Sequence, residues 1–145
     1  MIREWHRGEY VVSTDKSRLD LDVVHGYLKR SYWAKGVPFD VVLRSVENSL
    51  VFGMYRDEEQ VGFARVITDH ATFAYLADVF VLEGHRGLNL GKWLVETVLA
   101  HPELQDLRRW MLATRDAHGL YRRYSFTGLA EPEIFMEKKS ACYGV

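Results

Sequence analysis

A short glycine-containing segment, RGLNLGKW, combines residue types that can hold an anion. Arg86 and Lys92 carry positive charge on either side of Gly87 and Gly91, and an apolar run with helical spacing follows. The first backbone N–H groups of a helix have no internal partner and carry partial positive charge. Glycine lets the backbone turn tightly and lets an anion approach without a Cβ in the way. The segment therefore predicts a phosphate or pyrophosphate site at a helix start.

Two common nucleotide motifs do not fit this segment. A Walker A loop encloses four residues between its glycines and has a hydroxyl residue after its Lys, whereas Gly87 and Gly91 enclose LNL and Trp93 follows Lys92. The dinucleotide fingerprint G-x-G-x-x-G is also missing from the sequence. For Gly87 taken alone, a plain helix start remains the simpler interpretation.

The segments around this site predict a single mixed α/β domain over residues 1–145. The run 71–82 is almost wholly apolar, as expected of a central strand buried on both faces. Apolar side chains recur at helical spacing in 19–28, and again from Leu90 until Pro102 ends the run. The predicted order is β-α-α-β-β-β-α-β-α-β. Its strands are 9–14, the two arms of a hairpin in 50–69, 71–82, 109–114 and EIFMEK (133–138). Its helices are 19–30, one after Pro38, one from Leu90 and one in 116–124.

Composition narrows the class of protein. The chain has a net charge of -1 and a pI of about 6.6, which argues against a nucleic-acid binder attracted by bulk charge. No apolar stretch approaches the roughly 20 residues of a membrane span, and MIREWHRGEY lacks the apolar centre of a signal peptide. The lone Cys142 forms no internal disulfide, and no His pair has metal-ligand spacing. We therefore expect a cytoplasmic protein without a metal, and with neither membrane nor nucleic acid as a partner.

The strand and the glycine segment together resemble a known cofactor signature. FVLEGHRGLNLGKWL is similar to the acyl-CoA signature of the GNAT acyltransferase superfamily, R/Q-x-x-G-x-G/A after a strand. Asn89 stands where relatives usually have Gly, and Glu83 stands where they usually have Pro. The positions that fit the pattern are Arg86, Gly87, Leu88, Leu90 and Gly91.

A second segment lies at the distance expected for that superfamily. DAHGLYRRYSF resembles A-x-x-L-Y-x-x-x-G-F, with Ala117, Leu120, Tyr121 and Phe126 in register and Ser125 in place of Gly. The predicted element order also matches the superfamily's fold along nearly the whole chain. The resemblance therefore implies a mixed, mostly antiparallel sheet flanked by helices, with a splayed central pair of strands.

The resemblance implies acetyl-CoA as the co-substrate. In such proteins the pantetheine arm enters the gap between the splayed strands and bonds to strand backbone like an additional strand. Carried over, the backbone near Val79 holds the arm, the amides from Leu88 to Lys92 hold the pyrophosphate, and Thr114 occupies a slot whose side chain often contacts the arm. The implied cofactor-binding residues are Val79, Phe80, Val81, Arg86, Gly87, Leu88, Asn89, Leu90, Gly91, Lys92 and Thr114.

Two side chains are candidates for moving protons. Tyr121 matches the superfamily's tyrosine that lies near the CoA sulfur and protonates the departing thiolate. Asp78 is the candidate general base, because it is the only carboxylate in 71–82. A carboxylate in an otherwise apolar strand is unusual unless it has a structural or chemical role. The structural alternatives are a half-buried helical tyrosine and a buried acid that accepts structural hydrogen bonds. His118 is a second, weaker candidate for the base.

Aromatic residues indicate where an acceptor could bind. Tyr32 and Trp33 fall in the loop between the first two predicted helices, and Tyr75 falls on the central strand, so the three could form an aromatic wall. Aromatic faces attract ammonium groups, and Asp78 would add negative charge. A structural alternative for Trp33 is that it covers the core from the loop.

The resemblance implies an N-acetyltransferase that moves an acetyl group from acetyl-CoA to a primary amine of a small molecule, by direct attack in a ternary complex. Two alternatives stay open. One is a protein lysine or N-terminal acetyltransferase; the other is a catalytically weak acyl-CoA-binding module, which the departures at Asn89, Thr114 and Ser125 would favour. A sheet edge near the C-terminus could also pair in a homodimer.

Overall fold

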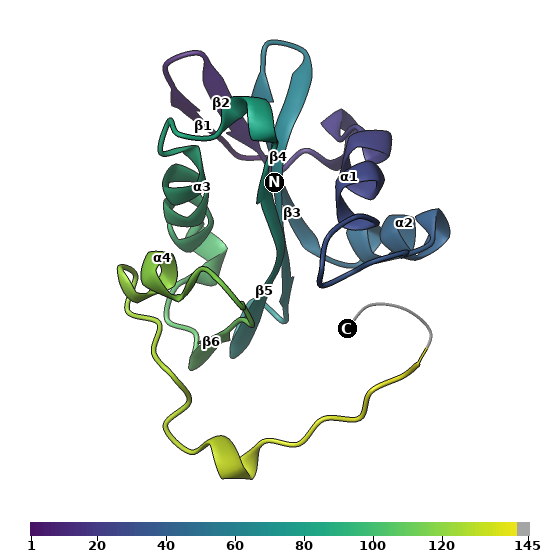
Figure 1. Cartoon of the computed structure of the whole chain (residues 1–145). Coiled ribbons are helices and arrows are strands. Elements are labelled where there is room, and N and C mark those ends of the chain that lie inside the picture. The colour runs from purple at the N-terminus through teal and green to yellow at the C-terminus, as the bar shows by residue number, and fades with distance from the viewer. Residues whose placement is uncertain (142–145) are drawn as a thin grey trace.

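The computed structural model describes residues 1–141 and shows one twisted sheet with helices on both faces (Figure 1). Cys142 lies outside the described residues. The six strands follow one another across the sheet in chain order, and every neighbouring pair is antiparallel except the parallel pair β5–β6. The strands are β1 (Glu4–Arg7), β2 (Tyr10–Ser13), β3 (Leu50–Arg56), β4 (Glu59–Thr68), β5 (Phe73–Val81) and β6 (Arg109–Met111). The predicted fold class, a mostly antiparallel sheet flanked by helices, is confirmed.

Helices divide the core into two clusters. α1 (Leu21–Leu28) and α2 (Phe39–Glu47) pack on one face of the sheet, and α3 (Leu90–Leu99) and α4 (His118–Arg122) cover the other (Figure 1). The side chain of Asp20 accepts hydrogen bonds from the amides of Asp22 and Val23, which fixes the start of α1. Short 3-10 helices lie at Lys16–Arg18, Glu83–His85, Pro102–Leu104 and Pro132–Ile134.

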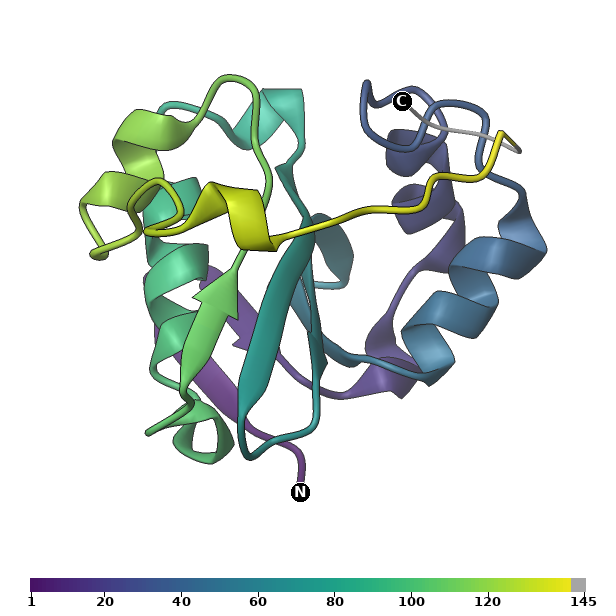
Figure 2. The ribbon, with the colours of Figure 1, turned by 90° about the horizontal axis from the view of Figure 1, so that it is seen from below.

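Two predicted elements differ at the ends of the chain. The N-terminal strand is one arm of a hairpin, β1–β2, that turns at Gly8 with φ +57°. The strand predicted for EIFMEK (133–138) is wrong. That segment begins within the 3-10 helix Pro132–Ile134 and continues as a non-strand tail, which lies below the sheet in Figure 1 and crosses in front of it in Figure 2. The tail leaves the sheet, so Ile134 and Met136, 59% and 98% exposed, have no strand beside them to pair with.

The parallel pair β5–β6 separates early. Register pairs end at Tyr75 with Met111, although β5 continues to Val81. The strand predicted over 109–114 therefore stops at Met111, because the chain beyond it turns away from β5. The C-terminal half of β5 is left without a strand neighbour on that side, and this gap positions the site described below.

A buried histidine makes the stability of this fold depend on pH. His101 is 1% exposed, and its ring lies against those of Trp5 and Phe52, with centroids 6.1 and 5.8 Å apart. Its Nδ1 accepts a hydrogen bond of 3.1 Å from the backbone N–H of Glu103. Burial lowers the pKa of His101, and the Glu103 carboxylate acts in the opposite direction.

We expect the free energy of unfolding to decrease as the pH falls from about 7 to about 5. The unfolded chain takes up a proton near the ordinary histidine pKa of about 6.5, whereas folded His101 stays neutral to lower pH, so acid favours unfolding. His101→Asn keeps a capping acceptor but does not titrate, and should flatten this part of the dependence. Urea denaturation across this pH range compares the two proteins. An unchanged dependence in the variant would contradict the role of His101.

Candidate active site

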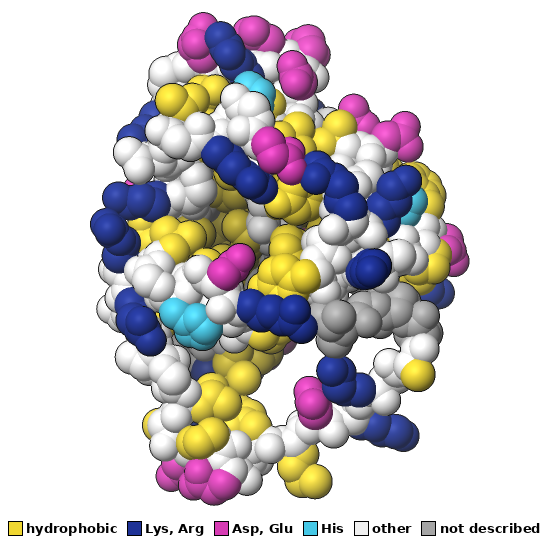
Figure 3. Space-filling model, viewed as in Figure 1, with side chains coloured by type: hydrophobic (Ala, Val, Ile, Leu, Met, Phe, Trp, Pro, Cys, Tyr) yellow, Lys and Arg dark blue, Asp and Glu magenta, His cyan; other side chains and the backbone are white. Residues whose placement is uncertain are grey.

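A large cavity opens where β5 and β6 separate. Its volume is about 1100 Å³, and its walls come from β5, the α1–α2 loop, the glycine segment and α4. Figure 3 shows a hollow on this face, with hydrophobic side chains inside and Lys and Arg side chains around it. The cavity lining includes every site residue predicted from the sequence except Leu88, which is 54% exposed, and the weaker base candidate His118. Residues from separate parts of the chain thus meet at one place.

The glycine segment turns through left-handed backbone before α3 begins. Gly87 has φ +84° and Asn89 has φ +59°, and no side chain caps the first amides of α3. A Cβ added at Gly87 or Gly91 would meet no atom within 4 Å, so the space above both is open. Asn89 adopts the conformation for which glycine is the usual residue, and asparagine tolerates it well. The turn therefore presents free amides to an anion.

Arg86 lies along the end of β5. Its Nε donates to the carbonyl of Val81 at 3.2 Å, and its Nη2 donates to the hydroxyl of Tyr27 at 2.8 Å. The Tyr27 ring stacks flat on Phe80, with centroids 4.1 Å apart. Tyr27 also lines the cavity, and sequence reasoning missed this, because its spacing is that of an ordinary buried helix stripe.

A salt bridge joins α1 to the segment that follows β5. The Arg30 Nη1 donates to Glu83 Oε1 at 2.8 Å, and the Arg30 guanidinium lies over the Tyr27 ring at 4.6 Å. The hydrogen bond from Arg30 lowers the pKa of Glu83 to about 2. Both side chains are more than half exposed, so the contribution of this pair to stability is small.

Asp78 lies in a bulge of β5. Phe63 pairs with Phe80 and Arg65 pairs with Ala77, so β5 has one more residue than β4 between these pairs. Asp78 has φ +56°, a left-handed conformation inside a strand. The bulge lies in the part of β5 that β6 no longer covers, so its backbone faces the cavity opening.

The Asp78 carboxylate is held by two donors. Arg65 Nε donates to Oδ2 at 2.7 Å, and the Trp33 indole N–H donates to Oδ1 at 2.9 Å. Arg65 also donates to the hydroxyl of Ser49 at 3.2 Å. The side chains of Arg65 and Asp78 are 17% and 10% exposed, so this is a largely buried ion pair. The positive charge of Arg65 offsets the negative charge that the sequence alone assigned to the acceptor side.

Tyr121 points into the cavity from α4 and is 8% exposed. Burial is the main cause that raises the pKa of Tyr121 to about 12, with Tyr32 and Asp116 as lesser causes. Its hydroxyl is therefore protonated at neutral pH and is able to donate. Tyr124 instead bonds to Glu96 at 2.8 Å and lies outside this cavity.

The backbone at the end of α4 explains the residue pattern of the segment DAHGLYRRYSF. Ser125 has φ +71°, and the amide of Phe126 donates to the carbonyl of Tyr121 at 3.2 Å. This is the long bond of a helix cap that usually needs glycine at the left-handed position. The Phe126 ring then packs edge-on against Tyr121, with centroids 5.8 Å apart.

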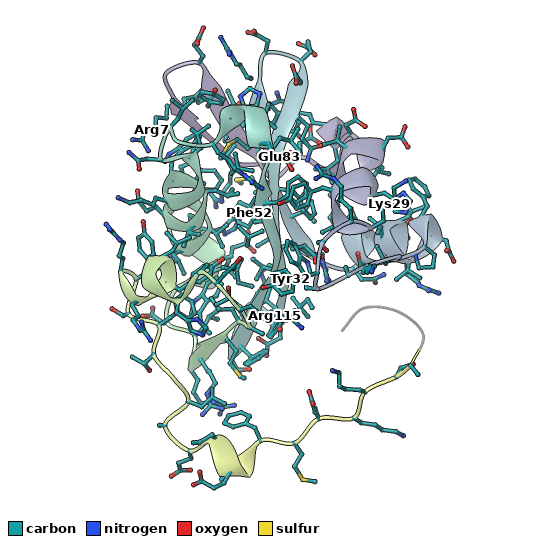
Figure 4. The ribbon with its side chains drawn as sticks, viewed as in Figure 1. Arg7, Lys29, Tyr32, Phe52, Glu83 and Arg115 are labelled. Carbon is teal, nitrogen blue, oxygen red and sulfur yellow. The ribbon has the colours of Figure 1, made fainter. Side chains whose placement is uncertain are left out.

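One of the residues predicted to bind the acceptor, Tyr32, contacts the segment between β6 and α4. The Tyr32 hydroxyl accepts a hydrogen bond of 3.0 Å from the backbone N–H of Arg115, and the Arg115 guanidinium lies 4.8 Å above the Tyr32 ring (Figure 4). Tyr75 and Thr114 also line the cavity, and the Thr114 hydroxyl accepts from the amide of Ala117. The second base candidate, His118, does not line it.

Within residues 1–141, no group of three or more His, Cys, Asp and Glu side chains is arranged to hold a metal ion. No helix in the same range is long and apolar enough to cross a membrane.

The chain is similar to proteins of one family. Residues 1–126 match the model of the acetyltransferase (GNAT) family. A proposed acetyltransferase of Gibberella zeae is 34% identical over 82% of this chain and 79% of its own length. A crystal structure from Xanthomonas campestris, proposed to be a GNAT-family acetyltransferase, is 52% identical with a TM-score of 0.88, over 90% of this chain and 93% of that one. A Clostridium acetobutylicum structure, proposed to be an acetyltransferase and solved with acetyl-CoA, is 10% identical with a TM-score of 0.65 over 96% of each chain, and shows the fold alone.

Arg65→Met should lower the free energy of unfolding by about 3 kcal/mol, because it leaves the buried Asp78 carboxylate with Trp33 as its remaining donor. Arg30→Met is the matched control. It removes an exposed pair with Glu83 and should have a much smaller effect. Urea denaturation of the two variants measures the difference. Equal losses would contradict a buried pair at Asp78.

Proposed function

The chain belongs to the acetyltransferase (GNAT) family, and on this basis we propose that it moves an acetyl group from acetyl-CoA to a primary amine. The observation that carries the proposal is the meeting of three parts in one cavity: uncovered β5 backbone, free amides at the start of α3, and the buried hydroxyl of Tyr121. These are the parts that acyl transfer from a long phosphorylated thioester needs.

The proposed cofactor site follows the open half of β5. The pantetheine arm would lie beside Val79–Val81 and use backbone groups that β6 leaves unpaired. The pyrophosphate would bind the amides from Leu88 to Lys92, with the charges of Arg86 and Lys92 nearby. Thr114 lies on the facing wall, where its side chain can contact the arm.

In the proposed reaction the neutral amine nitrogen attacks the thioester carbonyl carbon and the carbon–sulfur bond breaks. The backbone N–H groups near Val79 would stabilise the negative charge on the carbonyl oxygen. Tyr121 would give its proton to the departing thiolate. Asp78, directly or through a water, would take the proton of the amine, because each of its oxygens bonds to one donor and keeps further acceptor capacity.

The proposed acceptor is a small-molecule amine that reaches the thioester beside Tyr32, Trp33 and Tyr75. The Arg115 guanidinium already covers one face of Tyr32, so that face is not free for an ammonium group. Protein lysines and N-termini are the alternative acceptors, and an acyl-CoA-binding module is the alternative outside the enzyme class. An acceptor panel that contains amines and lysine peptides separates the first two.

Acetyl-CoA at about a hundred times its Kd should stabilise the protein by about 2.7 kcal/mol, which raises Tm by a few degrees. ATP, which has phosphates but no pantetheine arm, should raise it much less. Gly87→Val should lose the shift, because φ +84° strains a β-branched residue. Thermal denaturation with each ligand measures this. No shift with acetyl-CoA would overturn the proposed function.

Tyr121→Phe should lower kcat about 10²-fold while the Kd for acetyl-CoA changes little, because the variant loses the proton donor but keeps the ring. Tyr124→Phe is the control, since it removes a hydroxyl outside the cavity. Release of the CoA thiol gives kcat, and calorimetry gives Kd. Binding by the wild type without thiol release for any amine would favour the binding module.

A further inference from the structure

We propose that Tyr32 and Trp33 form a bracket across the gap between β5 and β6, and that this bracket sets the distance between the Asp78 bulge and Tyr121. The two residues would then act as positioning residues, in addition to any contact with an acceptor. The inference rests on the proposed function, because it concerns the two places where that reaction needs hydrogen-bond donors.

One end of the bracket is the bond from Trp33 to the bulge. The indole N–H reaches Asp78 Oδ1 at 2.9 Å, while Arg65 holds the other oxygen at 2.7 Å. The bulge has left-handed backbone at Asp78, and such strained backbone persists only where its surroundings fix it. Trp33 and Arg65 are those surroundings, so Trp33 helps to aim the amides next to the bulge.

The other end is the bond from Tyr32 to the segment that leads into α4. The Tyr32 hydroxyl accepts from the amide of Arg115 at 3.0 Å. The neighbouring Thr114 hydroxyl accepts from the amide of Ala117, and the Ala117 carbonyl accepts from the amide of Tyr121 at 3.2 Å. A short series of contacts therefore connects Tyr32 to the helix start that carries Tyr121.

The loop between the two ends is itself fixed. Ser31 is buried, donates to the carbonyl of Leu28 at 2.7 Å and accepts from the amide of Ala34 at 3.1 Å. The rings of Tyr32 and Trp33 meet edge to face, with centroids 5.2 Å apart and planes at 82°. Because the residues are adjacent and their rings hold each other, a shift at one end of the bracket moves the other.

Backbone pairing among residues 1–141 does not connect β5 to the segment after β6 near Asp78. In the described residues, backbone pairing between β5 and β6 stops at Tyr75, short of Asp78, and both Asp78 and Tyr121 line the cavity that opens beyond it. An oxyanion donor and an acid must reach the same thioester together, and a misplacement of about 1 Å can cost about 10²-fold in rate. Hydrogen bonds of the Tyr32 and Trp33 side chains connect the two sides of the gap, as backbone hydrogen bonds connect neighbouring strands elsewhere in the sheet.

The test uses Tyr32→Phe, Trp33→Phe and the double variant. Each single variant keeps a ring and removes one hydrogen bond, so we expect kcat to fall roughly tenfold while the Kd for acetyl-CoA stays within about threefold. The double variant should be about as slow as the slower single variant, because either change releases the bracket. Unchanged kcat in both single variants, or effects that multiply in the double variant, would overturn the bracket.

A spectroscopic readout separates positioning from a general loss of structure. The infrared carbonyl band of bound ¹³C-acetyl-CoA reports polarisation by the oxyanion donors, and Trp33→Phe should move it toward its value in water. Tyr124→Phe should leave both the band and kcat as in the wild type. A band that does not move in Trp33→Phe would overturn the bracket. Absence of acetyl-CoA binding to the wild type would instead overturn the proposed function, so the two failures are distinguishable.

Discussion

The early end of pairing between β5 and β6 is the constraint on which the rest of this structure depends. Backbone N–H and C=O groups inside a protein need partners, and unpaired ones are costly to bury. The separation leaves such groups on β5 from beyond Tyr75 to Val81. Arg86 satisfies one of them by donating to the Val81 carbonyl, and the others face a cavity of about 1100 Å³. An extended ligand with its own amides fits this edge better than a compact one.

The positions of the charged side chains in the cavity depend on the same separation of β5 and β6. Asp78 could not sit in a largely buried bulge without a cation beside it, and Arg65 provides the charge at 2.7 Å. The pair is close to neutral, so the part of the cavity around Asp78 is polar without being strongly acidic. The main excess of positive charge lies instead at Arg86 and Lys92, beside the free amides of α3. The cavity thus has a positively charged end and an end where the Arg65–Asp78 pair is nearly neutral, which suits the proposed reaction between acetyl-CoA and an uncharged amine.

Local patterns in the sequence predicted much of this arrangement, and long-range contacts could not be predicted. The apolar run 71–82 and the helix from Leu90 follow from hydrophobic spacing, which reports burial directly. The partner of Asp78 was missed because Arg65 is an ordinary residue of a hairpin arm. The tail was wrongly predicted as a strand because the short apolar run Ile-Phe-Met in 133–138 resembles a strand locally, while pairing also needs a neighbouring sheet edge within reach. The bond from Tyr32 to Arg115 joins residues 83 positions apart, and only the folded chain brings them together.

The two departures from glycine share one backbone feature. Asn89 and Ser125 stand where the family pattern has Gly, and both have positive φ, +59° and +71°. Glycine is usual at such positions because it lacks the Cβ that penalises left-handed backbone, so its physical role there is conformational. This chain keeps the conformation with other residues, at the cost of some strain that surrounding contacts must hold. At Ser125 those contacts include the cap bond from Phe126 to Tyr121, and at Asn89 they include the first turn of α3. Asn89 and Ser125 therefore keep the left-handed backbone that glycine usually provides at these two turns. Their difference from glycine gives little support to the alternative that the site no longer binds acetyl-CoA.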